Sequence, residues 1–134
     1  MSDLTRHATW REIHAQPAIW ADWAGQLPLA DLRGWIAAQA VDEVWFCGAG
    51  SSDYVGQIVA AALEGTGRWR AIATTDIVAR PRAYLASRRP LVVSFGRSGN
   101  SAESIGLLDA LDALAPDAPR LNITCNDRGA LALR

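Results

Sequence analysis

Residues 41–63 read VDEVWFCGAGSSDYVGQIVAAAL, and this stretch decides the fold. It opens with an apolar run, Val41–Cys47, which ends at Gly48 and predicts a buried strand. The apolar residues that follow recur at helical spacing, which favours a helix over Asp53–Glu64. A glycine- and serine-rich turn joins the two, so the sequence predicts a strand that leads directly into a helix.

The same alternation of strand and helix continues along the chain. Three further strands are predicted, at Trp69–Ala73, Pro90–Phe95 and Arg120–Cys125. Helices are predicted at Ile77–Ala86, with a break near Pro81, at Ser101–Leu114, and as a loop and first turn in Asn126–Arg134. The third strand, PLVVSF, is apolar without alternation, as expected of a sheet covered on both faces. This order predicts a parallel sheet between two helical layers, a three-layer α/β/α fold.

The first forty residues have a different pattern. Thr9-x-x-Glu12 is a capping-box motif that predicts a short helix, and Pro17 suits the first turn of a second one. A third helix is predicted over Leu29–Gln39. We therefore expect residues 1–40 to form an N-terminal helical segment and residues 41–134 to form the α/β domain.

Composition narrows the class of protein. The 134 residues are half hydrophobic and carry a formal net charge of −1. The chain therefore has no excess of positive charge that would attract nucleic acid or an anionic membrane. No apolar run is long enough to span a bilayer, and no secretory signal is visible. Cys47 and Cys125 stand far apart without metal-ligand spacing, so we expect free thiols, no metal and no cofactor. A cytoplasmic protein is the expectation.

The candidate site lies in the loops that follow two strands. Gly48–Ser52 contains G-x-G, but a dinucleotide motif needs a third glycine where Asp53 stands. In the second loop, three serines recur at every third residue beside Arg97: Ser98, Ser101 and Ser104. Hydroxyls, free N–H groups and the helix dipole favour a phosphate there. The alternative is that Asn100 and Glu103 form a capping box and the serines are solvated turn residues.

Five motifs follow one another in the order of a known family. They are Thr9–Pro17, Gly48–Ser52 (GAGSS), Thr74–Asp76 (TTD), Ser94–Ser104 (SFGRSGNSAES) and Ile123–Leu131 (ITCNDRGAL). Together they resemble the sugar isomerase (SIS) domain, most of all in the tagatose-6-phosphate ketose/aldose isomerases, also described as galactosamine-6-phosphate deaminases. The resemblance extends over nearly the whole chain from residue 9 and implies a parallel sheet of flavodoxin-like topology.

The resemblance implies a set of residues that bind the substrate phosphate. These are Gly50, Ser51, Ser52, Gly96, Arg97, Ser98, Gly99, Asn100 and Ser101. It also implies that Asn126 lies near the sugar. Gly96 stands where related glucosamine-6-phosphate synthases have a serine, so one hydroxyl of the family pattern is absent. The implied partners are a small-molecule sugar phosphate and further copies of the chain, with no nucleic acid and no membrane.

The implied function is that of an aldose–ketose isomerase or deaminase acting on amino-hexose or ketohexose 6-phosphates. Family members carry two SIS repeats, and ring opening and proton transfer belong to the second. The chain corresponds to most of the first, ending before its last strand, so we expect no catalytic base in it and an inactive isolated chain. Two alternatives remain, a non-catalytic SIS regulator that binds a phosphosugar and, less favoured by its glycine spacing, a dinucleotide-binding oxidoreductase.

Overall fold

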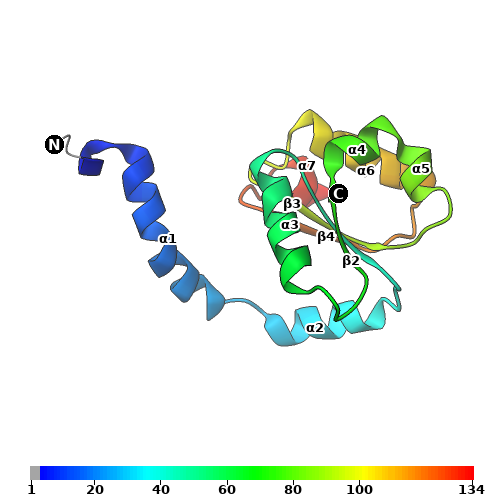
Figure 1. Ribbon diagram of the computed structural model, residues 1–134, viewed down its shortest axis with the longest axis horizontal. Helices are drawn as coiled ribbons and strands as arrows, with labels where there is room; N and C mark the ends of the chain where they lie inside the picture. The colour runs from blue at the N-terminus through cyan, green and yellow to red at the C-terminus, as the bar shows by residue number, and fades with distance from the viewer. Residues whose placement is uncertain (1–3) are drawn as a thin grey trace. The chain divides into compact units, whose positions relative to one another are not determined.

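The computed structural model describes residues 4–134, which fall into two compact units (Figure 1). The first unit ends at Ala38 and the second comprises Gln39–Arg134. Each unit is described by itself. No helix within residues 4–134 is both long enough and apolar enough to cross a membrane.

The first unit is helical. Its elements are a 3-10 turn at Leu4–Arg6, α1 at Ala8–Ala24 and α2 at Leu29–Ala38. The expected break at Pro17 is wrong, because α1 continues through this residue. Proline inside a helix removes one N–H donor and crowds the carbonyl four residues earlier, and α1 forms despite this cost. His7 is the N-cap and makes no side-chain bond, so the predicted capping box does not form.

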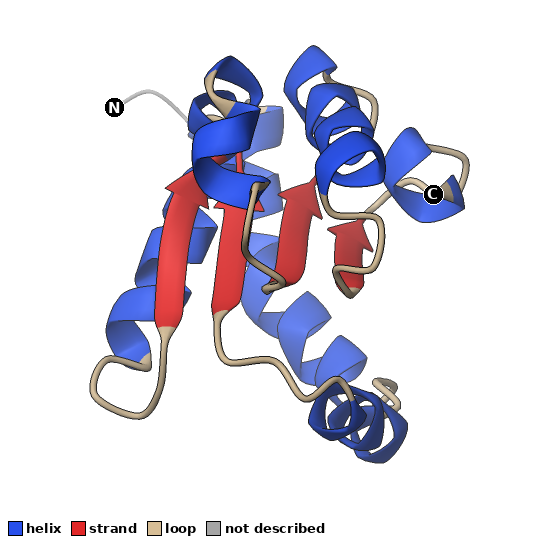
Figure 2. Ribbon diagram, turned by 90° about the vertical axis from the view of Figure 1, so that its right-hand side faces the viewer, coloured by secondary structure: helices blue, strands red, loops and turns tan. Residues whose placement is uncertain are grey.

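The second unit is a four-stranded parallel sheet with helices on both faces, which confirms the predicted fold class (Figure 2). The strands are β1 (Val44–Gly48), β2 (Trp69–Ala73), β3 (Leu91–Gly96) and β4 (Arg120–Thr124), in the order β2-β1-β3-β4. The helices are α3 (Ser51–Ala62), α4 (Thr74–Ala79), α5 (Pro81–Leu85), α6 (Ala102–Leu114) and α7 (Ala130–Leu133). This strand order matches the first four strands of flavodoxin-like folds.

Side-chain alternation along β1 assigns the helices to the two faces of the sheet. Trp45 and Cys47 are fully buried in the core that α4, α5 and α6 complete. Phe46 points to the other face, where α3 crosses the strand at Gly56. A Cβ on Gly56 would lie 3.1 Å from the Phe46 Cβ, so this glycine lets the helix approach the sheet closely. α3 therefore begins directly above the carboxyl end of β1.

The topology places two loops side by side. β1 pairs with β2 on one side and with β3 on the other, so the strand order changes direction between β1 and β3. In open parallel sheets this switch point leaves a crevice beyond the carboxyl ends of the strands. The loops after β1 and β3 lie at that crevice.

Candidate functional site

The loops after β1 and β3 enclose a pocket of about 330 Å³, which we call the serine pocket. Its lining residues come from the end of β3, from both loops and from the first turns of α3 and α6. They are Ala49, Gly50, Ser52, Phe95, Gly96, Arg97, Ser98, Gly99, Ser101, Glu103 and Ser104.

The first loop depends on two glycines. A Cβ on Gly48 would lie 2.4 Å from the backbone carbon of Ser52, so only glycine allows α3 to begin this close to the strand. Gly50, the N-cap of α3, has φ 59°, a conformation that glycine adopts without strain. The turn brings the hydroxyl of Ser52 to the pocket at the positive end of the α3 dipole.

The second loop ends in a serine cap. The N–H of Ser104 donates to Ser101 Oγ at 3.2 Å, and the two hydroxyl oxygens lie 3.0 Å apart. Ser101 is thus the N-cap of α6, and the alternative in which Asn100 caps the helix with Glu103 is wrong. The carboxylate-bearing Glu103 lines the pocket instead. Gly99 turns the loop at φ 66°.

A distant part of the chain, residues 124–131, holds this second loop in place, and we call it the brace segment. Asn126 Nδ2 donates to the Ser98 carbonyl at 2.8 Å, and the Ala130 N–H donates to Asn100 Oδ1 at 2.8 Å. The Leu131 N–H also donates to the Gly99 carbonyl at 3.2 Å. These bonds hold the backbone of the loop in place. Within the loop, the Asn100 N–H donates to Ser98 Oγ at 3.3 Å, so the Ser98 hydroxyl is held in place as well.

The structure brings most of the residues implied by the resemblance together. Those that line the serine pocket are Gly50, Ser52, Gly96, Arg97, Ser98, Gly99 and Ser101. Three do not line it: Ser51 is exposed beside it, and Asn100 and Asn126 turn their side chains toward the brace contacts. Their roles in binding stay predictions.

Four lining residues were absent from the implied set. Ser104 and Glu103 stand in the first turn of α6, Phe95 ends the apolar run of β3, and Ala49 lies between the two glycines. The every-third-residue serine pattern was the signal for Ser104. The other three carry no local signal, because lining depends on how the two loops face each other.

Two features at the pocket favour an anion, whereas the Glu103 carboxylate opposes one. Arg97 is exposed at its rim, and two helix N-termini begin there. Beneath the first loop, burial raises the pKa of the Cys47 thiol to about 12, and the Asp53 carboxylate adds to the effect, so this thiol stays protonated. Within residues 4–134 no cluster of His, Cys, Asp and Glu side chains could hold a metal ion.

The chain is similar to proteins that are named as enzymes of sugar phosphates. The D-galactosamine-6-phosphate deaminase AgaS of Shewanella sp. (strain ANA-3) is 37% identical across 92% of this chain and 35% of the relative. AgaS of Escherichia coli O157:H7 is 45% identical across 63% of this chain and 23% of the relative. The crystal structure of tagatose-6-phosphate ketose/aldose isomerase from E. coli matches with a TM-score of 0.77 and 31% identity, over 99% of this chain and 38% of that one.

No family model matches the sequence. The chain spans about a third of the length of the Shewanella deaminase and of the E. coli isomerase. Its similarity to them runs through the sheet and both loops, since the match to the isomerase structure covers nearly all of it. The chain therefore belongs to the SIS-type family of galactosamine-6-phosphate deaminases and tagatose-6-phosphate ketose/aldose isomerases.

Proposed function

We propose that the serine pocket binds the phosphate group of a hexose or hexosamine 6-phosphate. The observation that supports this most is the convergence of Ser52, Ser98 and Ser101 on one pocket at the starts of two helices. Hydroxyls, helix N–H groups and the nearby Arg97 guanidinium together complement a dianion. The brace segment fixes this arrangement before a ligand arrives, so less order has to be imposed on binding.

For the whole protein we propose aldose–ketose isomerisation or deamination, with galactosamine 6-phosphate or tagatose 6-phosphate as the substrate class. The names of the relatives support this assignment. Such a reaction needs a base that moves a proton between neighbouring carbons of the sugar. We assign phosphate recognition to the serine pocket and place that base outside it.

The test is the melting temperature of the chain with and without millimolar galactosamine 6-phosphate or tagatose 6-phosphate. A ligand that binds only the folded state raises the melting temperature by mass action. Ser52→Ala and Ser98→Ala should remove most of the ligand-induced shift, whereas Ser51→Ala should keep it, because Ser51 lies outside the pocket. Ser101→Ala also removes the α6 cap and should lower the melting temperature even without ligand.

A substitution at Glu103 should change the ligand-induced shift in melting temperature in the opposite direction. Its negative charge lines the pocket and opposes a phosphate, so Glu103→Gln should enlarge the ligand-induced shift. A shift that is equal in Ser51→Ala, Ser52→Ala and Ser98→Ala would contradict the proposed site. A cooperative melt that neither sugar phosphate changes would contradict the proposed function of the chain.

We also propose that the chain self-associates through α3. Three large side chains of this helix, Tyr54, Val55 and Ile58, are 65%, 44% and 69% exposed. Apolar side chains gathered on one exposed helix are typical of a contact surface. Light scattering on wild type and Ile58→Glu should show a dimer or larger species that the variant dissociates. A wild-type chain that is monomeric at high concentration would contradict this proposal.

A further inference from the structure

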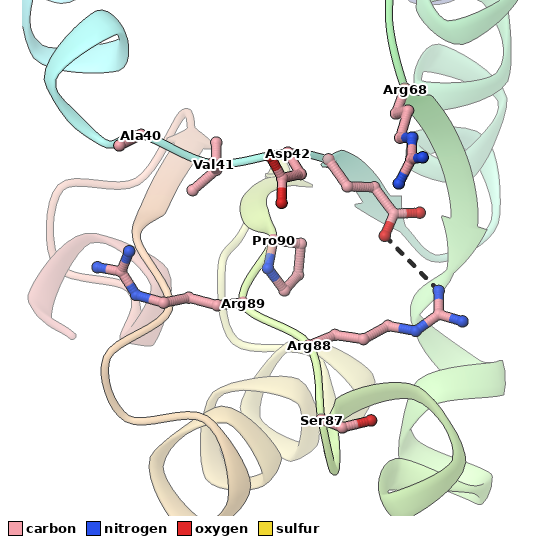
Figure 3. A pocket seen from close by; sticks show the side chains of 9 residues that line it. Ala40, Val41, Asp42, Arg68, Ser87, Arg88, Arg89 and Pro90 are labelled. Carbon is pink, nitrogen blue, oxygen red and sulfur yellow. Dashed lines mark ion pairs between the residues drawn. The ribbon is translucent and has the colours of Figure 1, made fainter.

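A second and larger pocket lies at the other end of the strands, beyond their amino ends. It has a volume of about 420 Å³ and is formed by residues 40–43 before β1, Arg68 before β2 and residues 87–90 before β3 (Figure 3). We call it the arginine pocket. Because the strands are parallel, it faces away from the serine pocket, across the five residues of β1, roughly 16 Å at about 3.3 Å per residue.

The arginine pocket carries an excess of positive charge. Arg68, Arg88 and Arg89 line it, against the carboxylates of Asp42 and Glu43. Glu43 is already paired outside the pocket, since its carboxylate lies 3.1 Å from the Arg70 guanidinium. The guanidinium groups in and beside the pocket therefore outnumber the carboxylates.

Two of the arginines are available to a ligand. The Arg68 side chain makes no ion pair within the part of the chain that the structure describes, and Figure 3 shows its guanidinium turned toward the hollow. Arg88 lies 3.6 Å from Glu43 with its side chain 49% exposed, a long contact that is readily exchanged for a stronger one. Arg89 is held at the side, where its Nε donates to the Asp117 carbonyl at 2.9 Å.

The carboxylate of Asp42 decides what kind of ligand fits. Figure 3 shows it pointing into the hollow, and it has no ion-pair partner within residues 4–134. A bare anion would be repelled by this group. A ligand that also carries hydroxyl donors would instead hydrogen-bond to it while its anionic group meets the arginines.

We propose that the arginine pocket is a binding site for a small phosphorylated polyol, separate from the serine pocket. The phosphate lies between Arg68 and Arg88, because each guanidinium can donate two parallel hydrogen bonds to phosphate oxygens. A hydroxyl of the same molecule donates to Asp42. Arg88 exchanges Glu43 for the phosphate, while Glu43 keeps Arg70.

The experiment is a titration of the ¹⁵N-labelled chain, followed by amide chemical shifts, with glucitol 6-phosphate, inorganic phosphate and glucitol as probes. The expected result is a shift of the amides in residues 40–43, 67–69 and 87–91, with glucitol 6-phosphate binding more tightly than phosphate and glucitol not binding. The double variant Arg68→Gln/Arg88→Gln should weaken binding roughly tenfold or more, because both charge-assisted contacts are lost. Arg82→Gln, an exposed arginine of α5 outside both pockets, is the matched control and should change nothing.

Asp42→Ala separates the two parts of the proposal. It should tighten binding of inorganic phosphate and abolish the advantage of glucitol 6-phosphate over it. An advantage that persists in this variant overturns the role of Asp42. Shifts confined to residues 96–104, or an equal loss in Arg82→Gln, overturn the arginine pocket as a site while leaving the proposal for the serine pocket intact.

Discussion

Two asparagines connect the second loop to the brace segment, and replacing each by aspartate should have different effects on stability. Asn126 uses its side chain as a donor, to the Ser98 carbonyl, whereas Asn100 uses its side chain as an acceptor, from the Ala130 N–H. Asparagine to aspartate is nearly isosteric and replaces the donor group with a second acceptor. We therefore expect Asn126→Asp to break its brace contact and Asn100→Asp to keep its own.

The magnitudes follow from these contacts. In Asn126→Asp a hydrogen bond is lost and the Ser98 carbonyl faces a carboxylate oxygen, which should lower the free energy of unfolding by roughly 2 kcal/mol. At roughly 4 °C per kcal/mol for a domain of this size, the melting temperature should fall by about 8 °C. In Asn100→Asp the acceptor remains and gains charge at the start of α7, so the change should stay within about 0.5 kcal/mol.

Urea denaturation of both variants at neutral pH measures the difference, and acid provides a second check. In the folded Asn126→Asp variant the introduced carboxyl takes up a proton above its ordinary pKa of about 3.9 and can donate again, so the gap to wild type should narrow as the pH falls from about 5.5 to about 4. The sign follows because a carboxyl that faces an acceptor has a raised pKa in the folded state. Equal destabilisation of both variants would refute the reasoning, since it would trace the effect to added charge and not to the lost donor.

Three further perturbations test the packing around the loops. Gly48→Ala should lower the free energy of unfolding by about 3 kcal/mol, because its Cβ would lie 2.4 Å from the backbone of Ser52; a loss in urea denaturation below about 1 kcal/mol would speak against this close approach. Ser94→Ala should raise stability by about 0.5–1 kcal/mol, because the Ser94 hydroxyl is buried without a partner, and a loss of stability would mean that the hydroxyl is paired. Above about pH 9 the stability of wild type should fall relative to that of Cys47→Ala, with a slope approaching about 1.4 kcal/mol per pH unit. The reason is that the thiol ionises in the unfolded chain, whereas burial raises its pKa to about 12 in the folded chain. Parallel stability curves of the two proteins would contradict that assignment.

The two central strands, β1 and β3, could be predicted from the sequence because most of their residues are buried on both faces of the sheet. Leu91–Gly96 is then a run of apolar residues that only Ser94 interrupts and that a glycine ends. Pro17 is the contrary case. Proline is favoured in the first turn of a helix and disfavoured in its interior, so this residue indicates a helix start at a position where α1 continues.

The cap of α6 shows why local rules fail at the site. Asn100 followed by Glu103 satisfies the capping-box pattern, yet the cap is Ser101. The side chain of Asn100 is engaged by Ala130, thirty residues further along the chain. Asn126 is likewise engaged by a distant residue, since its Nδ2 donates to the Ser98 carbonyl, and the local sequence indicated neither contact. Contacts between loops carry no periodic signal, because they depend on the order of strands in the sheet.

The two pockets, at opposite ends of the strands, would bind anions through different groups. The salt dependence of the two affinities should therefore differ. The serine pocket presents hydroxyls and helix N–H groups, whereas the arginine pocket relies on the charges of exposed side chains such as Arg68 and Arg88. Between about 50 mM and about 500 mM NaCl the Debye length falls from roughly 14 Å to roughly 4 Å, which screens exposed charges most. We expect glucitol 6-phosphate to lose roughly tenfold in affinity at the arginine pocket over this range, and galactosamine 6-phosphate to lose about twofold at the serine pocket. If the affinities at both pockets depended equally on salt, the serine pocket would also bind through net charge, with Arg97 and not the hydroxyls as its main contact.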